Sequence, residues 1–201
     1  MAKRKIRLGT LNMNVEHTHI EGAVIVTPNV FADERGQFLE SYNKRDFSKI
    51  GIDDDFVQSN LSTSVCGTLR GLHLQSAPYA QSKLVTVTRG SVQDICVDLR
   101  AGSKTFGQYA SVYLDHKSFK YFYIPEGCAH GFFAYEYTVF QYQCNNYYNK
   151  DSEVGIMWND PDLAIDWDTK DQSWDTDVKI KPIISDKDNQ NLSFQNFLKL
   201  S

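Results

Sequence analysis

Short runs of Val, Ile, Thr, Tyr and Phe follow one another along most of this chain, separated by Gly, Pro, Asn and Asp. Runs of this composition between turn-forming residues predict β-strands. In residues 94–99, Ile95, Val97 and Leu99 alternate with Asp94, Cys96 and Asp98. This period of two places one face of a strand on a core and the other toward a polar lumen or solvent. We expect strands at residues 23–27, 38–42, 83–88, 92–99, 110–114, 121–124 and 139–143.

Helical patterns are scarce. Residues 44–50, which Gly51 follows, and residues 193–200 are predicted to form short peripheral helices. Arg89-Gly90 has the composition of a hairpin turn between two strands. Residues 160–188 are polar and rich in turn formers, and we expect them to wrap around the strands rather than form a second domain.

The number of strands suggests a fold class. Eight or more antiparallel strands in one chain of this size are typical of a sandwich or a jelly-roll β-barrel, in which the lumen or one end holds a ligand. We therefore predict an all-β fold, with an N-terminal arm at residues 1–19 and a single domain at residues 20–201.

Composition and charge narrow the class of protein. The chain has 201 residues, a net charge of −4 and an isoelectric point near 5.7, so bulk electrostatics do not favour a nucleic-acid partner. No apolar run approaches the roughly 18 residues that span a membrane. The four cysteines form no CxxC pair, and we interpret them as free thiols of a cytoplasmic protein, although disulfides stay possible from the sequence.

Candidate chemistry concentrates in residues 60–75, NLSTSVCGTLRGLHLQ, and shortly after them. Arg70 and His73 lie three residues apart, and Lys83 follows. Histidine can accept and return a proton near neutral pH, and arginine fits phosphate oxygens with two hydrogen bonds. This grouping suggests a pocket for an anionic substrate on which a proton is moved. The competing interpretation is an ordinary strand with an edge histidine and solvated cations.

Several motifs occur in order along most of the chain, from about residue 20 to residue 190. They are DERG (33–36), FVQSN (56–60), STSVCGTLRGLHLQ (62–75), KLV (83–85), VDLRAGSKTFG (97–107), IPEGCAHGF (124–132), WNDPDLAIDW (158–167) and SDKD (185–188). Together they resemble the dTDP-4-dehydrorhamnose 3,5-epimerase family. The resemblance implies a cupin-like jelly-roll barrel, a homodimer with its N-terminal segment exchanged between subunits, and a nucleotide-sugar substrate. It also implies epimerisation of a dTDP-4-keto-6-deoxyhexose at C3 and C5 with no cofactor or metal.

The resemblance assigns the catalytic roles. Epimerisation beside a ketone removes a proton from one face and returns one to the other, through an enolate. By resemblance, His73 is the base and Asp188 is the carboxylate that orients it. Lys83 stabilises the enolate oxygen, and Tyr142 is the acid on the opposite face. We expect the Lys83 cation to lower the pKa of Tyr142, and the alternative for Tyr142 is a core aromatic that lines the barrel.

Binding roles are also carried over from the resemblance. They fall to Arg35 and Arg70 for the diphosphate, to Gln58, Asn60 and Glu40 for polar contacts, and to Phe38 and Tyr148 for the nucleotide end. His130 either contacts the substrate, orients Lys83 or has a structural role. Glu153 and Trp158 match the family pattern without an assigned role. The competing interpretation of Arg35 is a solvated turn residue after Asp33.

Other functions stay open. Ser59, Leu74, Ser82 and Cys128 depart from the residues usual in the family, which leaves the choice of sugar undecided. An epimerase of C3 alone or C5 alone, or a 3,4-ketoisomerase, would use the same enolate. A metal-dependent cupin is disfavoured because Gln75 stands where such proteins have a second histidine. A non-catalytic module that binds sugar nucleotides is disfavoured by the complete set of candidate catalytic residues.

Overall fold

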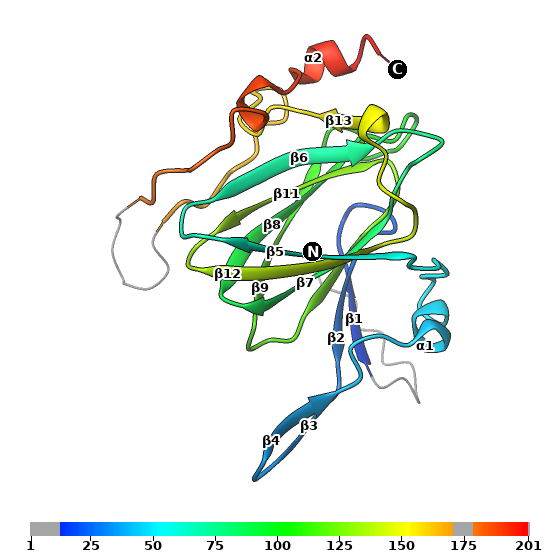
Figure 1. Cartoon of the computed structure of the whole chain (residues 1–201). Helices are drawn as coiled ribbons and strands as arrows, with labels where there is room; N and C mark the ends of the chain where they lie inside the picture. Colours follow the sequence, from blue (N-terminus) through cyan, green and yellow to red (C-terminus); the bar gives the residue numbers. More distant parts are fainter. Residues whose placement is uncertain (1–12, 171–178, 201) are drawn as a thin grey trace.

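Two antiparallel sheets packed against each other form the body of the protein in a computed structural model, which describes residues 13–170 and 179–200 (Figure 1). One sheet has the order β1-β2-β10-β7-β12-β5 and the other the order β13-β6-β11-β8-β9. The predicted all-β, jelly-roll class is confirmed. The strands are β1 (Met13–His17), β2 (Val24–Pro28), β3 (Val30–Asp33), β4 (Gly36–Leu39), β5 (Gln58–Ser64), β6 (Leu69–Gln75), β7 (Lys83–Arg89), β8 (Ser91–Asp98), β9 (Tyr109–Asp115), β10 (Tyr121–Ile124), β11 (Cys128–Ala134), β12 (Thr138–Cys144) and β13 (Glu153–Gly155).

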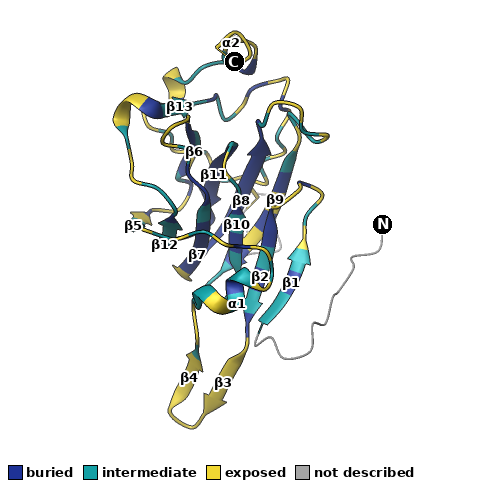
Figure 2. Cartoon of the chain, turned by 90° about the vertical axis from the view of Figure 1, so that its right-hand side faces the viewer, coloured by how far each residue is buried: buried dark blue, intermediate teal, exposed yellow. Residues whose placement is uncertain are grey.

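The main core lies between the two sheets. In β9, Ala110, Val112 and Leu114 are buried, whereas Ser111 and Tyr113 between them are exposed. This is the period of two expected for a strand with one face on a core. The interior cluster draws buried side chains from both sheets, so its burial holds the sheets together (Figure 2).

Later segments cover the outer face of the β13-β6-β11-β8-β9 sheet. Leu163 and Phe194, the latter in the short helix α2 (Phe194–Phe197), pack with Ile95 and Val97 of β8. Every residue of β8 is consequently buried. The alternation in residues 94–99 therefore separates two buried faces, one on the interior and one under this cover, rather than a buried face and a solvated face.

The helix α1 (Lys44–Ser48) confirms the first predicted helix and covers the other sheet. Its Phe47 is buried with Val24 and Val26 of β2. The Asn43 side chain caps the helix by accepting a hydrogen bond from the Arg45 backbone NH, which satisfies an otherwise unpaired donor. Two further one-turn elements are η1 (Lys150–Ser152) and η2 (Asp188–Gln190). No helix within the described residues is long and apolar enough to cross a membrane.

Two predictions about local structure were wrong, and several strands were not predicted. Gly90 does turn the chain, with φ +82°, but β7 and β8 on either side of it belong to different sheets and are not a hairpin. The strand predicted at 38–42 ends at Leu39, in β4. The expected strands did not include β1, β3, β5, β6, β11 and β13.

The β3–β4 hairpin projects from the body of the protein (Figures 1 and 2). Phe31 and Phe38 face each other across it, 57% and 71% exposed. Within the predicted N-terminal arm, Met13–His17 forms β1, an edge strand paired with β2. The rest of that arm, residues 1–12, lies outside the described residues.

Candidate functional site

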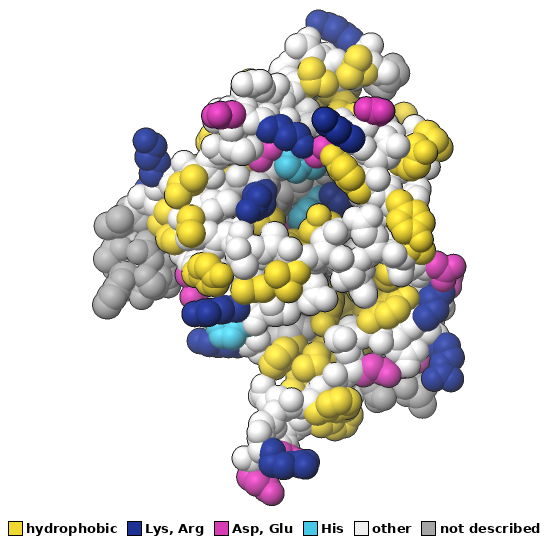
Figure 3. Space-filling model, in the orientation of Figure 1, with side chains coloured by type: hydrophobic (Ala, Val, Ile, Leu, Met, Phe, Trp, Pro, Cys, Tyr) yellow, Lys and Arg dark blue, Asp and Glu magenta, His cyan; other side chains and the backbone are white. Residues whose placement is uncertain are grey.

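A cavity of about 300 Å³ opens between the two sheets, and Figure 3 shows it as a hollow with histidine and cationic side chains inside. Three layers of the structure contribute to its walls: the β5, β7 and β12 strands, the β6 and β11 strands, and the segment at 185–188. The lining residues are Ser62, Arg70, His73, Lys83, His130, Gly131, Phe132, Phe140, Tyr142, Ser185, Lys187 and Asp188. Six of the twelve residues predicted for the site are among them.

An irregularity in β6 brings two of these residues to the same cavity. Residues three apart in a regular strand point to opposite faces. His73 pairs with His130 and Arg70 pairs with Phe132, so β6 has one residue more than β11 between these pairs. Such a bulge re-aims side chains. It allows both Arg70 and His73 to line the cavity.

His73 and Asp188 form the closest polar contact of the cavity. The His73 Nε2 atom lies 2.6 Å from Asp188 Oδ1, and the Gly71 backbone NH donates to Asp188 Oδ2 at 3.3 Å. Burial alone would raise the pKa of Asp188, but hydrogen bonding and charge from His73 outweigh it and hold that pKa below its usual value. The carboxylate is therefore ionised and can fix the imidazole ring and stabilise its protonated form.

The approach of β6 to β11 depends on two glycines. A Cβ atom on Gly71 would lie 2.6 Å from the Gly131 Cα atom, and Gly71 has φ +123°. No other residue type fits a backbone this close in that conformation. Gly71 thus lets the strand carry His73 to the cavity while its own NH anchors Asp188.

Lys83 begins β7 and enters the cavity from the opposite sheet, with Nζ 3.4 Å from the His73 carbonyl oxygen. Burial lowers the pKa of Lys83. Beside it, His130 Nε2 lies 2.9 Å from Asp94 Oδ2, and both residues are buried. Burial lowers the pKa of His130 and raises that of Asp94, so both shift toward their uncharged forms.

Tyr142 faces the cavity from β12, in the sheet opposite to His73. Burial raises the pKa of Tyr142, the charges of Cys144 and Glu153 add to this, and Arg70 opposes it. The expectation that Lys83 lowers this pKa was wrong: Arg70 is the opposing cation, and burial dominates. Tyr142 therefore stays protonated at neutral pH and can donate a proton.

Glu153 joins Tyr148 to Lys187, a cation that the sequence analysis missed. Lys187 lines the cavity, and its Nζ lies 2.7 Å from Glu153 Oε1. The Tyr148 hydroxyl donates to Glu153 Oε2 at 2.9 Å. Glu153, which had no assigned role, thus joins a predicted nucleotide contact to Lys187. The SDKD motif contains Lys187, and its position beside Asp188 was the signal that could have identified it.

Gln58 and Asn60 lie on the same side of β5 as Ser62, because alternate residues of a strand share a face. Gln58 Nε2 donates to Asn60 Oδ1 at 3.2 Å, and Gln58 Oε1 accepts from the Tyr148 backbone NH at 3.0 Å. These two predicted contacts therefore extend the cavity-facing side of β5 toward Tyr148.

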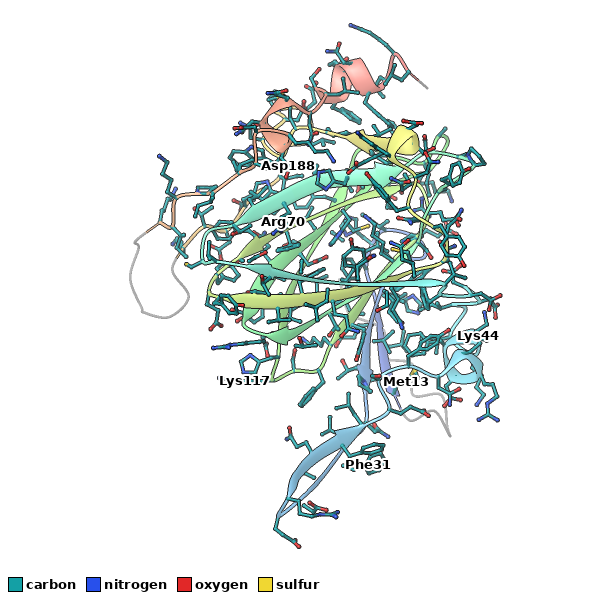
Figure 4. The ribbon with its side chains drawn as sticks, in the orientation of Figure 1. Met13, Phe31, Lys44, Arg70, Lys117 and Asp188 are labelled. Atoms are coloured by element: carbon teal, nitrogen blue, oxygen red, sulfur yellow. The ribbon has the colours of Figure 1, made fainter. Side chains whose placement is uncertain are left out.

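The remaining predicted residues are not brought to the cavity of their own chain. Arg35 and Phe38 lie on the projecting hairpin, where Arg35 forms hydrogen bonds and an ion pair with Asp33, two residues away. Figure 4 shows the hairpin, marked by Phe31, far from the labelled Arg70 and Asp188. Glu40 accepts from the Asn43 side chain next to α1. Trp158 packs with Leu69, Phe133 and Tyr135 and does not line the cavity.

The cavity combines a base, an acid and cations. His73, held by Asp188, faces Tyr142 across the space between the sheets, while Lys83, Arg70 and Lys187 supply positive groups. Such a set can move a proton on an anionic substrate and stabilise a developing oxyanion. Within residues 13–170 and 179–200, no group of three or more His, Cys, Asp and Glu side chains is arranged to hold a metal ion.

Comparisons with known proteins agree with these features. Residues 17–196 match the model of a family described as dTDP-4-dehydrorhamnose 3,5-epimerase. The chain is 43% identical over 178 residues to the Shigella flexneri protein of that name, which covers 88% of this chain and 93% of the relative. A crystal structure of a Legionella pneumophila dTDP-6-deoxy-D-glucose-3,5-epimerase in complex with dTDP-4-keto-L-rhamnose is 40% identical, with a TM-score of 0.84, covering 92% of this chain and 94% of that one. A 3'-monoepimerase from Streptomyces bikiniensis, in complex with dTDP-quinovose, is 30% identical with a TM-score of 0.79, covering 91% and 89%.

Proposed function

This chain belongs to the dTDP-4-dehydrorhamnose 3,5-epimerase family and is an epimerase, and we propose that the cavity between its sheets is where it inverts the sugar. The substrate is a dTDP-4-keto-6-deoxyhexose, epimerised at C3 and C5. The observation that carries the site assignment is the 2.6 Å contact of His73 with Asp188 in a cavity that Tyr142 enters from the opposite sheet.

His73 is the proposed base. Protons on C3 and C5 are acidic because the C4 ketone delocalises the resulting carbanion as an enolate. A neutral imidazole takes such a proton, and the ionised Asp188 stabilises the imidazolium that forms. The low pKa of Asp188 supports this role, because the carboxylate keeps its charge throughout the neutral range.

Lys83 is the proposed partner of the C4 oxygen. Its ammonium can donate a hydrogen bond to the enolate as negative charge develops there, which lowers the barrier most when the donor is held in a dry site. The burial that lowers the pKa of Lys83 is a sign of such a site. His130 and Asp94, buried beside it, hold this part of the wall in place.

Tyr142 is the proposed acid. A proton must return to the face opposite the one from which it left, and Tyr142 comes from the sheet opposite to His73. The raised pKa of Tyr142 keeps the phenol protonated until the carbanion needs it. A cofactor is not required by this scheme, since two side chains carry both protons.

Cations at the mouth of the cavity are the proposed diphosphate contacts. Arg70 and Lys187 line the mouth, and Lys187 can leave Glu153 for a phosphate oxygen. The nucleoside is proposed to bind next to these cations, at the hydrogen-bonded group of Gln58, Asn60 and Tyr148. There the Tyr148 ring can stack on the base.

We propose that the protein forms a homodimer, which would explain why the hairpin projects from the body. Phe31 and Phe38 form an exposed apolar pair beside Arg35, an arrangement that an isolated chain would not favour. We propose that the hairpin of one protomer supplies Arg35 and Phe38 to the nucleotide end of its partner. The cytoplasmic location is also a proposal, supported by the four cysteines, which are free thiols.

Proton NMR of dTDP-4-keto-6-deoxyglucose with the protein in deuterium oxide tests the reaction. Deuterium at both C3 and C5, with the rhamno-configured sugar trapped by a reductase, is the expected result. Label at one carbon would indicate an epimerase of C3 or C5 alone, and a 3-keto product a ketoisomerase. Tight binding of the nucleotide without exchange would contradict the proposal and favour a binding module, and loss of exchange on removal of a bound metal would favour a metal-dependent cupin.

A further inference from the structure

Two phenyl rings form an apolar wall in a cavity whose other described side chains are polar or charged. Phe132 of β11 and Phe140 of β12 both line the cavity. Their ring centroids lie 4.3 Å apart with an interplanar angle of 13°, so the rings stack. The two strands belong to different sheets, and the stacked pair therefore bridges the cavity where the sheets meet.

The position of this wall is fixed by its neighbours. The His130 ring stacks on Phe140 with centroids 5.8 Å apart, and the Phe140 and Tyr142 centroids are 6.3 Å apart. Phe132 and Phe140 are only 4% and 1% exposed, so packing fixes both rings, and only a small part of each ring faces the cavity that they line. The wall thus lies directly beside Tyr142, the proposed acid.

We propose that the Phe132–Phe140 wall is the subsite for the C6 methyl group of the sugar, and that it selects 6-deoxy sugars against sugars with a C6 hydroxyl. This inference rests on the proposed function. The sugar carries oxygen on C1 to C4 and in its ring, so the C6 methyl is its one wholly apolar substituent. The methyl group loses nothing on burial against phenyl rings, whereas a hydroxyl there would lose its water without gaining a partner.

Packing is the competing explanation for these rings. Phe132 and Phe140 also belong to the interior core cluster, together with Phe122, which is fully buried and does not line the cavity. Any large-to-small change in this cluster is expected to lower stability. A test must therefore measure discrimination between two ligands, a quantity that loss of packing alone does not change, and Phe122 is the matched control.

Titration calorimetry with dTDP-quinovose and dTDP-glucose provides this measurement, because the two ligands differ only by the C6 hydroxyl and neither is turned over. We expect the wild-type protein to bind dTDP-quinovose tighter by about 10- to 100-fold. Equal affinities would overturn the methyl subsite and leave the proposed function intact. Failure of dTDP and both sugars to bind would overturn the proposed function itself.

Variants locate the discrimination. Phe140→Leu is expected to reduce the ratio of the affinities for dTDP-quinovose and dTDP-glucose at least threefold, which corresponds to about 0.7 kcal/mol. Phe122→Leu should lose a similar amount of thermal stability but leave this ratio unchanged. If Phe140→Leu fails to fold, Phe132→Leu takes its place, and the wild-type ratio remains decisive. A ratio unchanged in the folded wall variant, or reduced equally in Phe122→Leu, would overturn the assignment.

Discussion

The cavity and the β3–β4 hairpin both carry residues expected to bind the substrate, yet they are held in opposite ways. In the cavity, His73 and Asp188 are joined by a short contact, and Asp188 is 4% exposed. On the hairpin, Arg35 is held by Asp33 two residues away, with side chains 84% and 44% exposed. The cavity is preorganised for chemistry, whereas the hairpin is organised only locally. This difference predicts that cavity variants lower kcat and that hairpin variants raise KM.

The largest effect is expected at the proposed base. His73→Ala should lower kcat and solvent exchange by about 10²–10⁴-fold, because general-base catalysis is lost, with the affinity for dTDP nearly unchanged. Deuterium exchange by NMR and titration calorimetry measure the two quantities. His19→Ala, at an exposed histidine away from the cavity, is the control. Unchanged exchange in the His73 variant would remove it as the base.

Tyr142→Phe separates the two halves of the reaction. Loss of the acid should slow formation of the epimerised sugar about 10²-fold. Proton abstraction by His73 should be slowed less, so exchange exceeds epimerisation. Tyr113→Phe, at a tyrosine that is 48% exposed, is the control. An equal loss of exchange and epimerisation would place Tyr142 in binding rather than in proton transfer.

Arg35→Ala tests the other side of the comparison. Loss of one charge-assisted contact with the diphosphate should raise KM about tenfold and leave kcat within about twofold. Steady-state kinetics measure both, and Arg45→Ala, an exposed arginine of α1, is the control. A KM equal to that of the wild type would mean that the hairpin does not reach a substrate. Analytical ultracentrifugation checks that the variant keeps the oligomeric state of the wild type.

The smallest expected effect is on acid stability. Asp188 and Asp33 both have lowered pKa values, but Asp188 is buried and Asp33 is exposed. A carboxylate with a lowered folded-state pKa stabilises the fold above its unfolded pKa, about 3.9 for Asp, and loses this contribution as the pH falls toward the folded value. The Tm of the wild type should therefore fall more steeply below about pH 4 than that of Asp188→Asn. Asp33→Asn should follow the wild type, and an equal flattening in both variants would contradict the comparison.

The sequence predicted strands best where Val, Ile, Tyr and Phe are frequent between turn-forming residues, including β8, every residue of which is buried. Residues 110–114 and 121–124 were placed almost to the residue, because alternation is visible there. Strand β11 was missed because Ala129, Gly131 and Ala134 give its sequence a weak strand preference. The Arg89-Gly90 turn was misassigned because local composition does not tell which sheet the next strand joins. Which strands pair with one another is decided by contacts between residues far apart in the sequence.

The site was predictable mainly through family motifs. His73 and Asp188 lie 115 residues apart, and no periodicity connects them. The spacing of Arg70 and His73 argues against a shared face in a regular strand, and the bulge that reconciles them leaves no clear sign in the sequence. The pKa of Tyr142 depends on burial and on Arg70, which only the packed structure reveals.

The position of Asp188 has a consequence for the order in which the sheets fold and activity appears. Every strand of the two sheets is complete by Gly155, yet the carboxylate that holds His73 comes from η2, which the chain reaches much later. The barrel can therefore acquire its sheet hydrogen bonds before the contact between His73 and Asp188 exists. On refolding from denaturant, the far-ultraviolet circular dichroism signal should recover first and turnover later. The same delay would keep a nascent chain inactive until its C-terminal segment docks on β6.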